Sequence, residues 1–268
     1  MTTVHAVVPD GIDDTARPSG GNAYDRRVLD GLRAAGWTVR EHHVAGDWPR
    51  PDREALAGLT AVLAEIPTGA VLLVDGLIGS CSADVLVAEA GRLRLVVLVH
   101  LPLAATDPAA TSGEGRVLTS ATAVLATSDW THRLIVDTYE LADHRVHVAH
   151  PGVDAAPLAP GTPTGGSLLC VGAVSPLKGQ AALADALGSV AALPWRCVLA
   201  GALDVAPAYV ADVRRRLAAA GLADRVSLVG PLAREALQRA YAAADLVVVP
   251  SRAETYGMVV TEALARGL

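Results

Sequence analysis

Short apolar runs alternate with helical patterns along almost the whole chain, and this alternation constrains the fold more than any other feature. Runs rich in Val and Leu, such as Val4–Val8, Ala70–Asp75 and Leu93–His100, predict strands. Stretches such as Tyr24–Ala35 and Arg53–Glu65 place apolar side chains at helical spacing. Repeated strand–helix units are typical of parallel sheets with right-handed crossovers and helices on both faces. The sequence therefore predicts an α/β protein.

A stretch rich in Pro, Gly and Ala at residues 155–166 interrupts this alternation, which resumes at Ser167 and continues to a helix beginning near Met258. We therefore expect an N-terminal Rossmann-like domain over residues 1–154, a linker, and a second Rossmann-like domain over residues 167–268. The second domain is expected to be incomplete, because only four strands are predicted in it. Ligands of open α/β sheets bind beyond the carboxyl ends of the strands, so functional residues are expected in the loops after strands, facing a cleft between the domains.

Composition excludes several classes of protein. Hydrophobic residues make up 51% of the 268 residues, enough to build buried cores. The formal net charge of −6 argues against a nucleic-acid partner, which would require clustered Lys and Arg. The three cysteines are too scattered for a disulfide scaffold, and neither a signal peptide nor a membrane span is predicted. We expect a cytoplasmic protein whose oligomeric state the sequence leaves open.

The strongest functional pattern is the segment over residues 250–265, which follows a predicted strand and opens a helix. Glu254 lies in the loop after the strand, where ligands of such sheets bind. The entry to the helix, where free N–H groups favour an anion, consists of Tyr256, Gly257 and Met258. Glu262 lies one turn further on, so its carboxylate can face the same pocket. An N-capping acid followed by a solvated glutamate is the simpler alternative, but the strand, turn and glycine context favours a site.

Three more loops after predicted strands carry candidate residues. Lys178 follows the first strand of the second domain and can reach a phosphate as a point charge. Gly20 and Gly21 lie in a glycine-rich turn before the first helix, and His100 ends an apolar strand. Each also has an ordinary structural explanation: a surface lysine, a tight turn and a polar strand end.

Other chemistries lack their motifs. The sequence has no G-x-G-x-x-G after the first strand of either domain and no G-x-S-x-G, which argues against dinucleotide oxidoreductases and α/β-hydrolases. It also has no D-x-D, the pattern through which some transferases hold a nucleotide sugar with a metal ion. We therefore expect neither a metal nor another cofactor.

Together these segments resemble the group 1 (family 4) retaining glycosyltransferases, which have the GT-B fold. The shared elements, in chain order, are Gly20-Gly21, His100, Pro151-Gly152-Val153-Asp154, Lys178-Gly179 and the E-x7-E pair Glu254 and Glu262. The resemblance implies a metal-independent enzyme that moves a sugar from a nucleotide diphosphate sugar, the co-substrate, to an acceptor with retention of anomeric configuration. The donor sugar, its base and the acceptor cannot be identified from the sequence.

The resemblance also implies roles for individual residues. The candidate catalytic residues are Glu254, which would contact the transferred sugar, and His100. The candidate donor-binding residues are Gly20, Gly21, Lys178, Tyr256, Gly257, Met258 and Glu262, with Arg252 and Gly230 as weaker candidates. Among them, Glu262 would contact the ribose hydroxyls, and the diphosphate would meet Lys178 and backbone amides. The first domain would bind the acceptor and the second the donor.

Two departures from the family pattern matter. Members commonly carry an arginine five residues before the lysine, where this chain has Ala173. Members also continue beyond the E-x7-E helix, so we expect this chain to be truncated at its C-terminus. Two other functions stay open: an epimerase-like GT-B enzyme acting on a nucleotide sugar, and a non-catalytic GT-B fragment that only binds the nucleotide.

Overall fold

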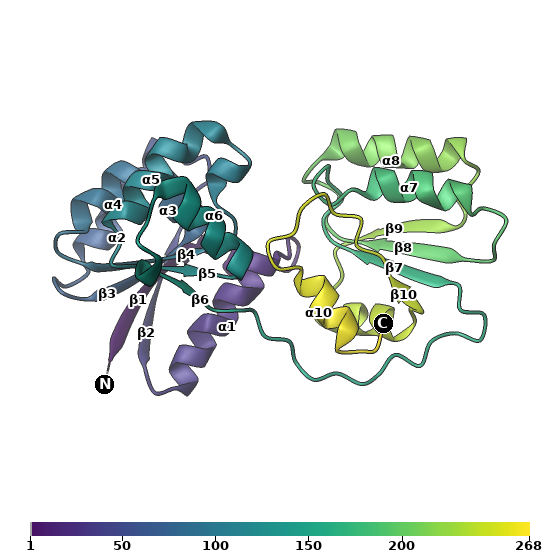
Figure 1. The fold of residues 1–268 in the computed structure, drawn as a ribbon, viewed down its shortest axis with the longest axis horizontal. Helices are drawn as coiled ribbons and strands as arrows, with labels where there is room; N and C mark the ends of the chain where they lie inside the picture. Colours follow the sequence, from purple (N-terminus) through teal and green to yellow (C-terminus); the bar gives the residue numbers. More distant parts are fainter. Residues whose placement is uncertain (1) are drawn as a thin grey trace. The chain divides into compact units, whose positions relative to one another are not determined.

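The computed structural model describes residues 2–268, which form two compact units (Figure 1). Unit 1 comprises the chain up to Asp13 together with Ser19–Pro151, and unit 2 comprises Asp14–Pro18 and Gly152–Leu268. One unit contains a six-stranded parallel sheet and the other a four-stranded parallel sheet. The predicted α/β class with two parallel sheets is therefore confirmed.

Unit 1 has the strand order β2-β1-β3-β4-β5-β6. The strands are β1 (Thr3–Pro9), β2 (Thr38–Val44), β3 (Val71–Asp75), β4 (Arg94–Val99), β5 (Ala123–Ala126) and β6 (Val146–Val148). The helices are α1 (Gly20–Ala34), α2 (Arg53–Ala64), α3 (Gly76–Cys81), α4 (Ala83–Glu89), α5 (Thr111–Ser120) and α6 (Asp129–Tyr139), with short 3-10 turns η1 (Asp10–Asp13), η2 (Leu103–Ala105), η3 (Pro108–Ala110) and η4 (Asp143–Arg145). The strand order reverses between β1 and β3, and ligands of open α/β sheets bind beyond the strand ends at such a point.

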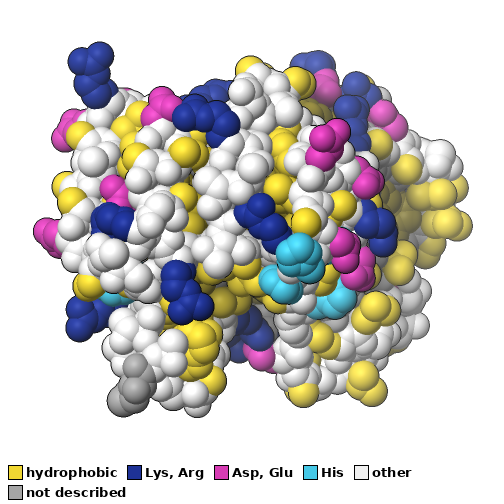
Figure 2. Space-filling model, turned by 60° about the vertical axis from the view of Figure 1, so that its left-hand side comes forward, with side chains coloured by type: hydrophobic (Ala, Val, Ile, Leu, Met, Phe, Trp, Pro, Cys, Tyr) yellow, Lys and Arg dark blue, Asp and Glu magenta, His cyan; other side chains and the backbone are white. Residues whose placement is uncertain are grey.

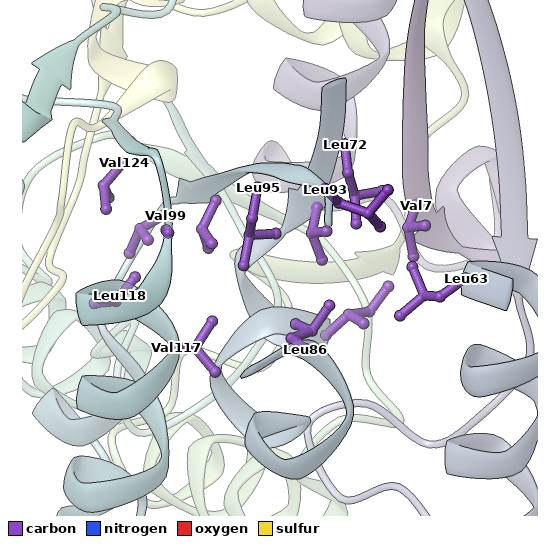
Figure 3. Close-up of a cluster of buried hydrophobic side chains, with 14 of the residues drawn as sticks. Val7, Leu63, Leu72, Leu86, Leu93, Leu95, Val99, Val117, Leu118 and Val124 are labelled. Atoms are coloured by element: carbon purple, nitrogen blue, oxygen red, sulfur yellow. The ribbon is translucent and has the colours of Figure 1, made fainter. Parts of the chain in front are cut away.

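The core of unit 1 lies on both faces of its sheet. Val7 of β1 packs in a cluster with Leu59 and Leu63 of α2. Successive side chains of a strand point to opposite faces, and the adjacent Ala6 and Val8 are also buried, so the other face of the sheet is covered too. Figure 3 shows the larger cluster, between the sheet and helices α2, α4 and α5. Its labelled members are Val7, Leu63, Leu72, Leu86, Leu93, Leu95, Val99, Val117, Leu118 and Val124. Burial of these aliphatic side chains is what holds the strand ends of unit 1 in place.

Unit 2 has the strand order β10-β7-β8-β9. The strands are β7 (Ser167–Val171), β8 (Arg196–Ala200), β9 (Val226–Gly230) and β10 (Leu246–Val247), and the helices are α7 (Gln180–Ser189), α8 (Pro207–Ala219), α9 (Arg234–Ala242) and α10 (Met258–Leu264). Helices α7 and α8 cover one face of this sheet, and α9 and α10 cover the other (Figure 1). The two core clusters accordingly contain Leu187 and Val213 on one side, and Tyr241 and Ala263 on the other.

Four elements differ from the sequence-based expectation. Helix α1 begins at Gly20, because the Ser19 side chain caps it by accepting a hydrogen bond from the Asn22 N–H; Gly20 and Gly21 therefore lie in its first turn rather than in a turn before it. Strand β10 has only two residues, since the chain leaves the sheet before Pro250. Helices α3 and α5 were not predicted, because their short sequences, rich in Gly, Ser and Thr, show no clear helical period.

The surface mixes both signs of charge. Figure 2 shows Lys and Arg side chains interspersed with Asp and Glu on the face in view. Within residues 2–268, no helix has both the length and the apolar character needed to cross a membrane.

Candidate functional site

The loop between β7 and α7 carries Lys178 and is held in shape by a buried glutamine. Gln180 is 1% exposed. Its side-chain Oε1 accepts a hydrogen bond from the Ser175 N–H at 3.2 Å, and its Nε2 donates to the Ala173 carbonyl at 3.1 Å. Because the amide is bonded at both ends, the backbone before Lys178 is fixed from beneath. Sequence reasoning missed Gln180, which looks like an ordinary helix-start residue.

Lys178 and Glu254, 76 positions apart, meet in unit 2. The Lys178 Nζ donates to Glu254 Oε1 at 2.6 Å, and both side chains stay partly exposed. The two loops are also joined through their backbones, since the Arg252 N–H donates to the Leu177 carbonyl at 2.9 Å. Lys178 is the only lysine in the sequence, a signal that sequence reasoning did not use. The structure therefore brings a cation and a carboxylate together beyond the carboxyl ends of β7 and β10.

Gly179 lets the two loops approach this closely. Its φ of +71° lies in the left-handed region, and a Cβ added to it would lie 2.1 Å from the Pro250 carbonyl oxygen. No larger residue can occupy that space without moving one loop. The glycine after Lys178 is therefore part of the reason that Lys178 reaches Glu254.

The other donor-side candidates lie around these loops. Gly257 has a φ of +80° and precedes α10, and a Cβ on it would lie 3.9 Å from the Cβ of Glu254. Tyr256 is half-buried beside it, Met258 is the first residue of α10, and the Arg252 residue is exposed. Gly230 ends β9, where its carbonyl accepts from the Gly201 N–H at 2.9 Å. The roles assigned to these residues stay predictions.

Glu262 is bonded to a different partner. Its Oε2 accepts a hydrogen bond from the buried Tyr241 hydroxyl at 2.7 Å. The phenol lies on α9 and the carboxylate on α10, so this bond links the two helices that cover one face of the sheet. Tyr241 also escaped sequence reasoning, because an aromatic residue in an amphipathic helix normally indicates core packing.

In unit 1, His100 and Gly21 lie together. His100 follows β4, and a Cβ added to Gly21 would lie 3.3 Å from the His100 Cδ2. The imidazole Nε2 is 2.8 Å from Asp25 Oδ1, and Tyr24 meets the ring edge-on with centroids 5.4 Å apart. Asp25 and Tyr24 of α1 thus hold the ring, and Gly21 leaves room for it because it has no side chain. Sequence reasoning missed Asp25, because a polar residue in an amphipathic helix normally lies on its solvent-exposed face.

A second carboxylate, Asp75, lies at the end of β3. Its Oδ1 caps α3 by accepting from the Leu77 N–H at 2.9 Å, and its Oδ2 is 3.9 Å from His100 Nε2. Burial, and then the nearby charge of Asp25, raises the pKa of Asp75 to about 7. Burial by itself lowers the pKa of His100, but the hydrogen bond to Asp25 and the two carboxylate charges raise it overall.

Asp25, Asp75 and His100 are also of residue types that can bind a metal ion. One ligand atom from each of Asp25, Asp75 and His100 lies within 4.8 Å of the others. The cluster is closed by its own hydrogen bonds, with Asp25 bonded to the imidazole and Asp75 to the backbone of α3. Asp25, Asp75 and His100 therefore keep their arrangement through their own hydrogen bonds and do not require a metal ion. The expectation of a metal-free protein stays a prediction.

The segment after His100 is anchored by the fully buried Glu114 of α5. The carboxylate accepts from the N–H groups of Leu103 and Ala104 at 2.8 and 3.0 Å. It also accepts from the Ser80 hydroxyl, at 2.5 Å, and from the Tyr139 hydroxyl. One glutamate therefore ties the segment after β4 to α3 and α6.

Asp75→Asn is expected to flatten the pH dependence of unit 1 stability. A carboxyl whose pKa is about 7 in the folded state binds its proton more tightly there than in the unfolded chain. Asp75 therefore contributes stability that is fully present below about pH 4 and is lost as the pH rises through about 7. Asparagine can still cap α3 through its carbonyl oxygen but has no charge to lose.

Urea unfolding measured across this pH range checks the expectation. The free energy of unfolding of the wild-type chain should fall more steeply with rising pH than that of Asp75→Asn. Asp137→Asn, exposed on α6, serves as the control and should keep the wild-type slope. Equal slopes for the wild type and Asp75→Asn would contradict the raised pKa of Asp75.

The second unit matches a known protein family. Residues 165–268 match the family described as "Glycosyl transferases group 1". The D-inositol 3-phosphate glycosyltransferase of Mycolicibacterium smegmatis is 33% identical over 190 residues, which cover 65% of this chain and 43% of that protein. The corresponding protein of Jonesia denitrificans is 32% identical over 175 residues, covering 58% and 41%. The matched part of this chain thus spans less than half the length of these relatives, and the predicted resemblance to group 1 glycosyltransferases is confirmed.

Solved structures resemble the chain over its whole length. Sucrose-phosphate synthase from Thermosynechococcus elongatus has a TM-score of 0.78 at 21% identity, covering 100% of this chain and 80% of that one. HepE from Anabaena, solved in complex with UDP-glucose, has a TM-score of 0.74 at 19% identity and covers 100% and 79%. At these identities the likeness establishes the fold. The predicted pair of Rossmann-like parallel sheets of the GT-B type is confirmed.

Proposed function

We propose that this chain, whose residues 165–268 match the group 1 glycosyl transferases, transfers a sugar from a nucleotide diphosphate sugar to an acceptor with retention of anomeric configuration. The observation that carries the proposal is the pairing of Lys178 Nζ with Glu254 Oε1 at 2.6 Å, beyond the strand ends of unit 2. The names of the relatives, and the UDP-glucose bound by the structural neighbour HepE, support a nucleotide-sugar donor.

The chemistry assigns one task to each member of the pair. Cleavage of the bond between the sugar and the diphosphate leaves negative charge on the departing oxygen, and the Lys178 ammonium stabilises that charge. Glu254 accepts hydrogen bonds from hydroxyls of the sugar as its ring gains oxocarbenium character. The ammonium has three N–H groups, so it can keep its bond to Glu254 while donating to a phosphate oxygen.

Unit 1 is the proposed acceptor side. His100 Nε2 is bonded to Asp25, whereas its Nδ1 has no hydrogen-bond partner among residues 2–268. We assign that nitrogen to a hydroxyl of the sugar or of the acceptor. Asp25 fixes the orientation of the ring, so His100 meets the substrate already positioned.

Product analysis tests the proposal. The chain is incubated with UDP-sugars and GDP-sugars, and with D-inositol 3-phosphate and simple sugars as candidate acceptors. Acceptor-dependent release of the nucleoside diphosphate, together with an NMR coupling constant that gives the donor's anomeric configuration in the product, is the expected result. Interconversion of the donor without transfer would indicate an epimerase-like enzyme, and nucleotide binding without any turnover would indicate a binding fragment.

Lys178→Ala is expected to weaken nucleoside diphosphate binding by about 1.5–3 kcal/mol, or roughly 10- to 150-fold, the range for a hydrogen bond to a charged group. Ala173 stands where the family commonly has an arginine, so no second cation from that position compensates. Isothermal calorimetry with UDP and GDP measures the loss. Arg214→Ala, an exposed cation on α8, is the control and should bind as the wild type does. An unchanged affinity in Lys178→Ala would remove Lys178 from the phosphate site.

Turnover is expected to persist in the presence of a chelator, because the proposed phosphate site uses Lys178 rather than a bound ion. The measurement is the rate of product formation after dialysis against EDTA, with and without added Mg²⁺ or Mn²⁺. Rates equal to within about twofold agree with the expectation. Activity that disappears in EDTA and returns only with Mg²⁺ or Mn²⁺ would show that the site is wrongly assigned.

A further inference from the structure

The Tyr241 hydroxyl is the only group of the described chain that hydrogen-bonds the Glu262 carboxylate. The phenol donates to Oε2 at 2.7 Å, and Oε1 has no hydrogen-bond partner within residues 2–268. The neighbouring Arg266 donates to the Glu262 backbone carbonyl at 2.5 Å and to Gln238 Oε1 at 2.6 Å, and so leaves the carboxylate alone. One carboxylate oxygen is therefore anchored and the other is open.

The Tyr241 side chain is held in place by its surroundings. Tyr241 is 0% exposed and packs in a cluster that includes Leu169, Ala244 and Ala263. The guanidinium of Arg266 lies over its ring, 4.5 Å from the centroid. A hydroxyl held by a ring enclosed in this way defines one position for the group it bonds, whereas Glu262 is only half-buried.

The pKa of the Tyr241 phenol keeps its hydroxyl in the protonated form that donates a hydrogen bond to Glu262. Burial, and then the negative charge of Glu262, raises the pKa of Tyr241 well above its ordinary value. The hydroxyl therefore stays protonated at neutral pH and donates to the carboxylate, which accepts. The hydrogen bond between Tyr241 and Glu262 therefore forms without a proton leaving the phenol.

We propose that Tyr241 is a positioning residue that holds the Glu262 carboxylate in the orientation that binds the adjacent 2′- and 3′-hydroxyls of the donor ribose. This inference rests on the proposed function, which assigns the ribose to Glu262. Carboxylate oxygens accept strong hydrogen bonds from hydroxyl groups. A carboxylate fixed in advance loses less conformational entropy when the ribose binds. Tyr241 thus strengthens binding only of ligands that carry those hydroxyls.

The test compares UDP with 2′,3′-dideoxy-UDP, or the GDP pair if GDP binds more tightly. Calorimetry of the wild type should show UDP binding at least about tenfold more tightly than its dideoxy counterpart, because removing the hydroxyls leaves Glu262 unbonded. Tyr241→Phe keeps the ring and removes the hydroxyl. It should weaken UDP binding by about 3- to 10-fold and leave dideoxy-UDP binding unchanged.

Two further variants make the result specific. Tyr209→Phe is the matched control, because its hydroxyl accepts from the Ala181 N–H at 2.9 Å elsewhere in unit 2, and it should leave the preference for UDP intact. In the background of Glu262→Ala, adding Tyr241→Phe should cause no further loss, since the group that Tyr241 positions is already gone. Melting curves identify any variant that is unfolded, and the Glu262→Ala background then provides the comparison.

The outcomes separate the inference from the proposed function. A wild-type chain that binds neither nucleotide contradicts the proposed function and the inference with it. A wild type that does not distinguish UDP from dideoxy-UDP removes Glu262 from the ribose site. If the wild type distinguishes them and Tyr241→Phe weakens both ligands equally, or neither, the inference alone is overturned.

Discussion

Replacing Glu114 with alanine is expected to lower the free energy of unfolding of unit 1 by about 3–5 kcal/mol, because four hydrogen-bond donors lose their shared acceptor. The carboxylate is 0% exposed and accepts hydrogen bonds from two hydroxyls and two backbone N–H groups. Alanine leaves these four donors without that acceptor. Ser80 is buried and the other three donors belong to half-buried residues, and a donor left unsatisfied away from water costs about 1–3 kcal/mol. The segment after His100 should also lose its fixed position.

Urea denaturation followed by circular dichroism measures this loss. Glu54→Ala provides the control, because Glu54 is exposed in the first turn of α2 and should cost less than about 1 kcal/mol. Tyr139→Phe removes one of the four donors and should cost much less than Glu114→Ala. A loss below about 1 kcal/mol for Glu114→Ala would mean that the carboxylate network adds little to stability.

Gly179→Ala is expected to destabilise unit 2 by about 2–5 kcal/mol and to weaken binding of nucleoside diphosphate. The left-handed φ of +71° costs an alanine about 1–2 kcal/mol, and overpacking against the Pro250 carbonyl adds about 1–3 kcal/mol. Relief of the clash requires the loop with Lys178 to move away from the loop with Glu254. Both the melting temperature and the calorimetric affinity should therefore fall together.

The same substitution at Gly188 is the matched control. Gly188 lies inside α7, where a Cβ would meet Ala220 Cβ at an ordinary 3.7 Å. Alanine there should stabilise the helix by up to about 1 kcal/mol and leave ligand affinity unchanged. Gly179→Ala behaving like Gly188→Ala would show that the two loops do not need their close approach.

The sequence predicted most of the regular structure because apolar periodicity is local. The strands predicted over Val4–Val8, Ala70–Asp75 and Leu93–His100 are found as β1, β3 and β4, with each end within one residue of its predicted position. Prediction failed where tertiary packing overrides local pattern. Helix α5 is rich in Gly, Ser and Thr, yet it forms around the buried Glu114 and its four hydrogen bonds. Strand β10 stops after Val247, where the chain turns toward Glu254.

The candidate site was predictable only in part, for a related reason. Lys178 and Glu254 could be found because loops after parallel strands carry ligands, a rule that depends on topology alone. The residues that hold other parts of the site lie on helices: Asp25 bonds His100, Gln180 bonds the loop before Lys178, and Tyr241 bonds Glu262. Each looks like an ordinary polar or core residue until its neighbour is known. Contacts made across 75 or 21 positions, as for Asp25 with His100 and Tyr241 with Glu262, leave no local trace in a single sequence.

Lys178, which is paired with Glu254, is a site in this chain that an amine-specific reagent can label. Acylating reagents at neutral pH modify ε-amines and the α-amine of the N-terminus, and this sequence has a single ε-amine, in the Lys178 side chain, which is 30% exposed. One peptide in a digest therefore reports the state of this loop by mass spectrometry. Its rate of acylation is set by how often the ammonium leaves Glu254 and gives up its proton, and a phosphate that holds the ammonium lowers that rate. The occupancy of the proposed donor site can thus be followed in a cell lysate, without purifying the protein and without knowing the acceptor.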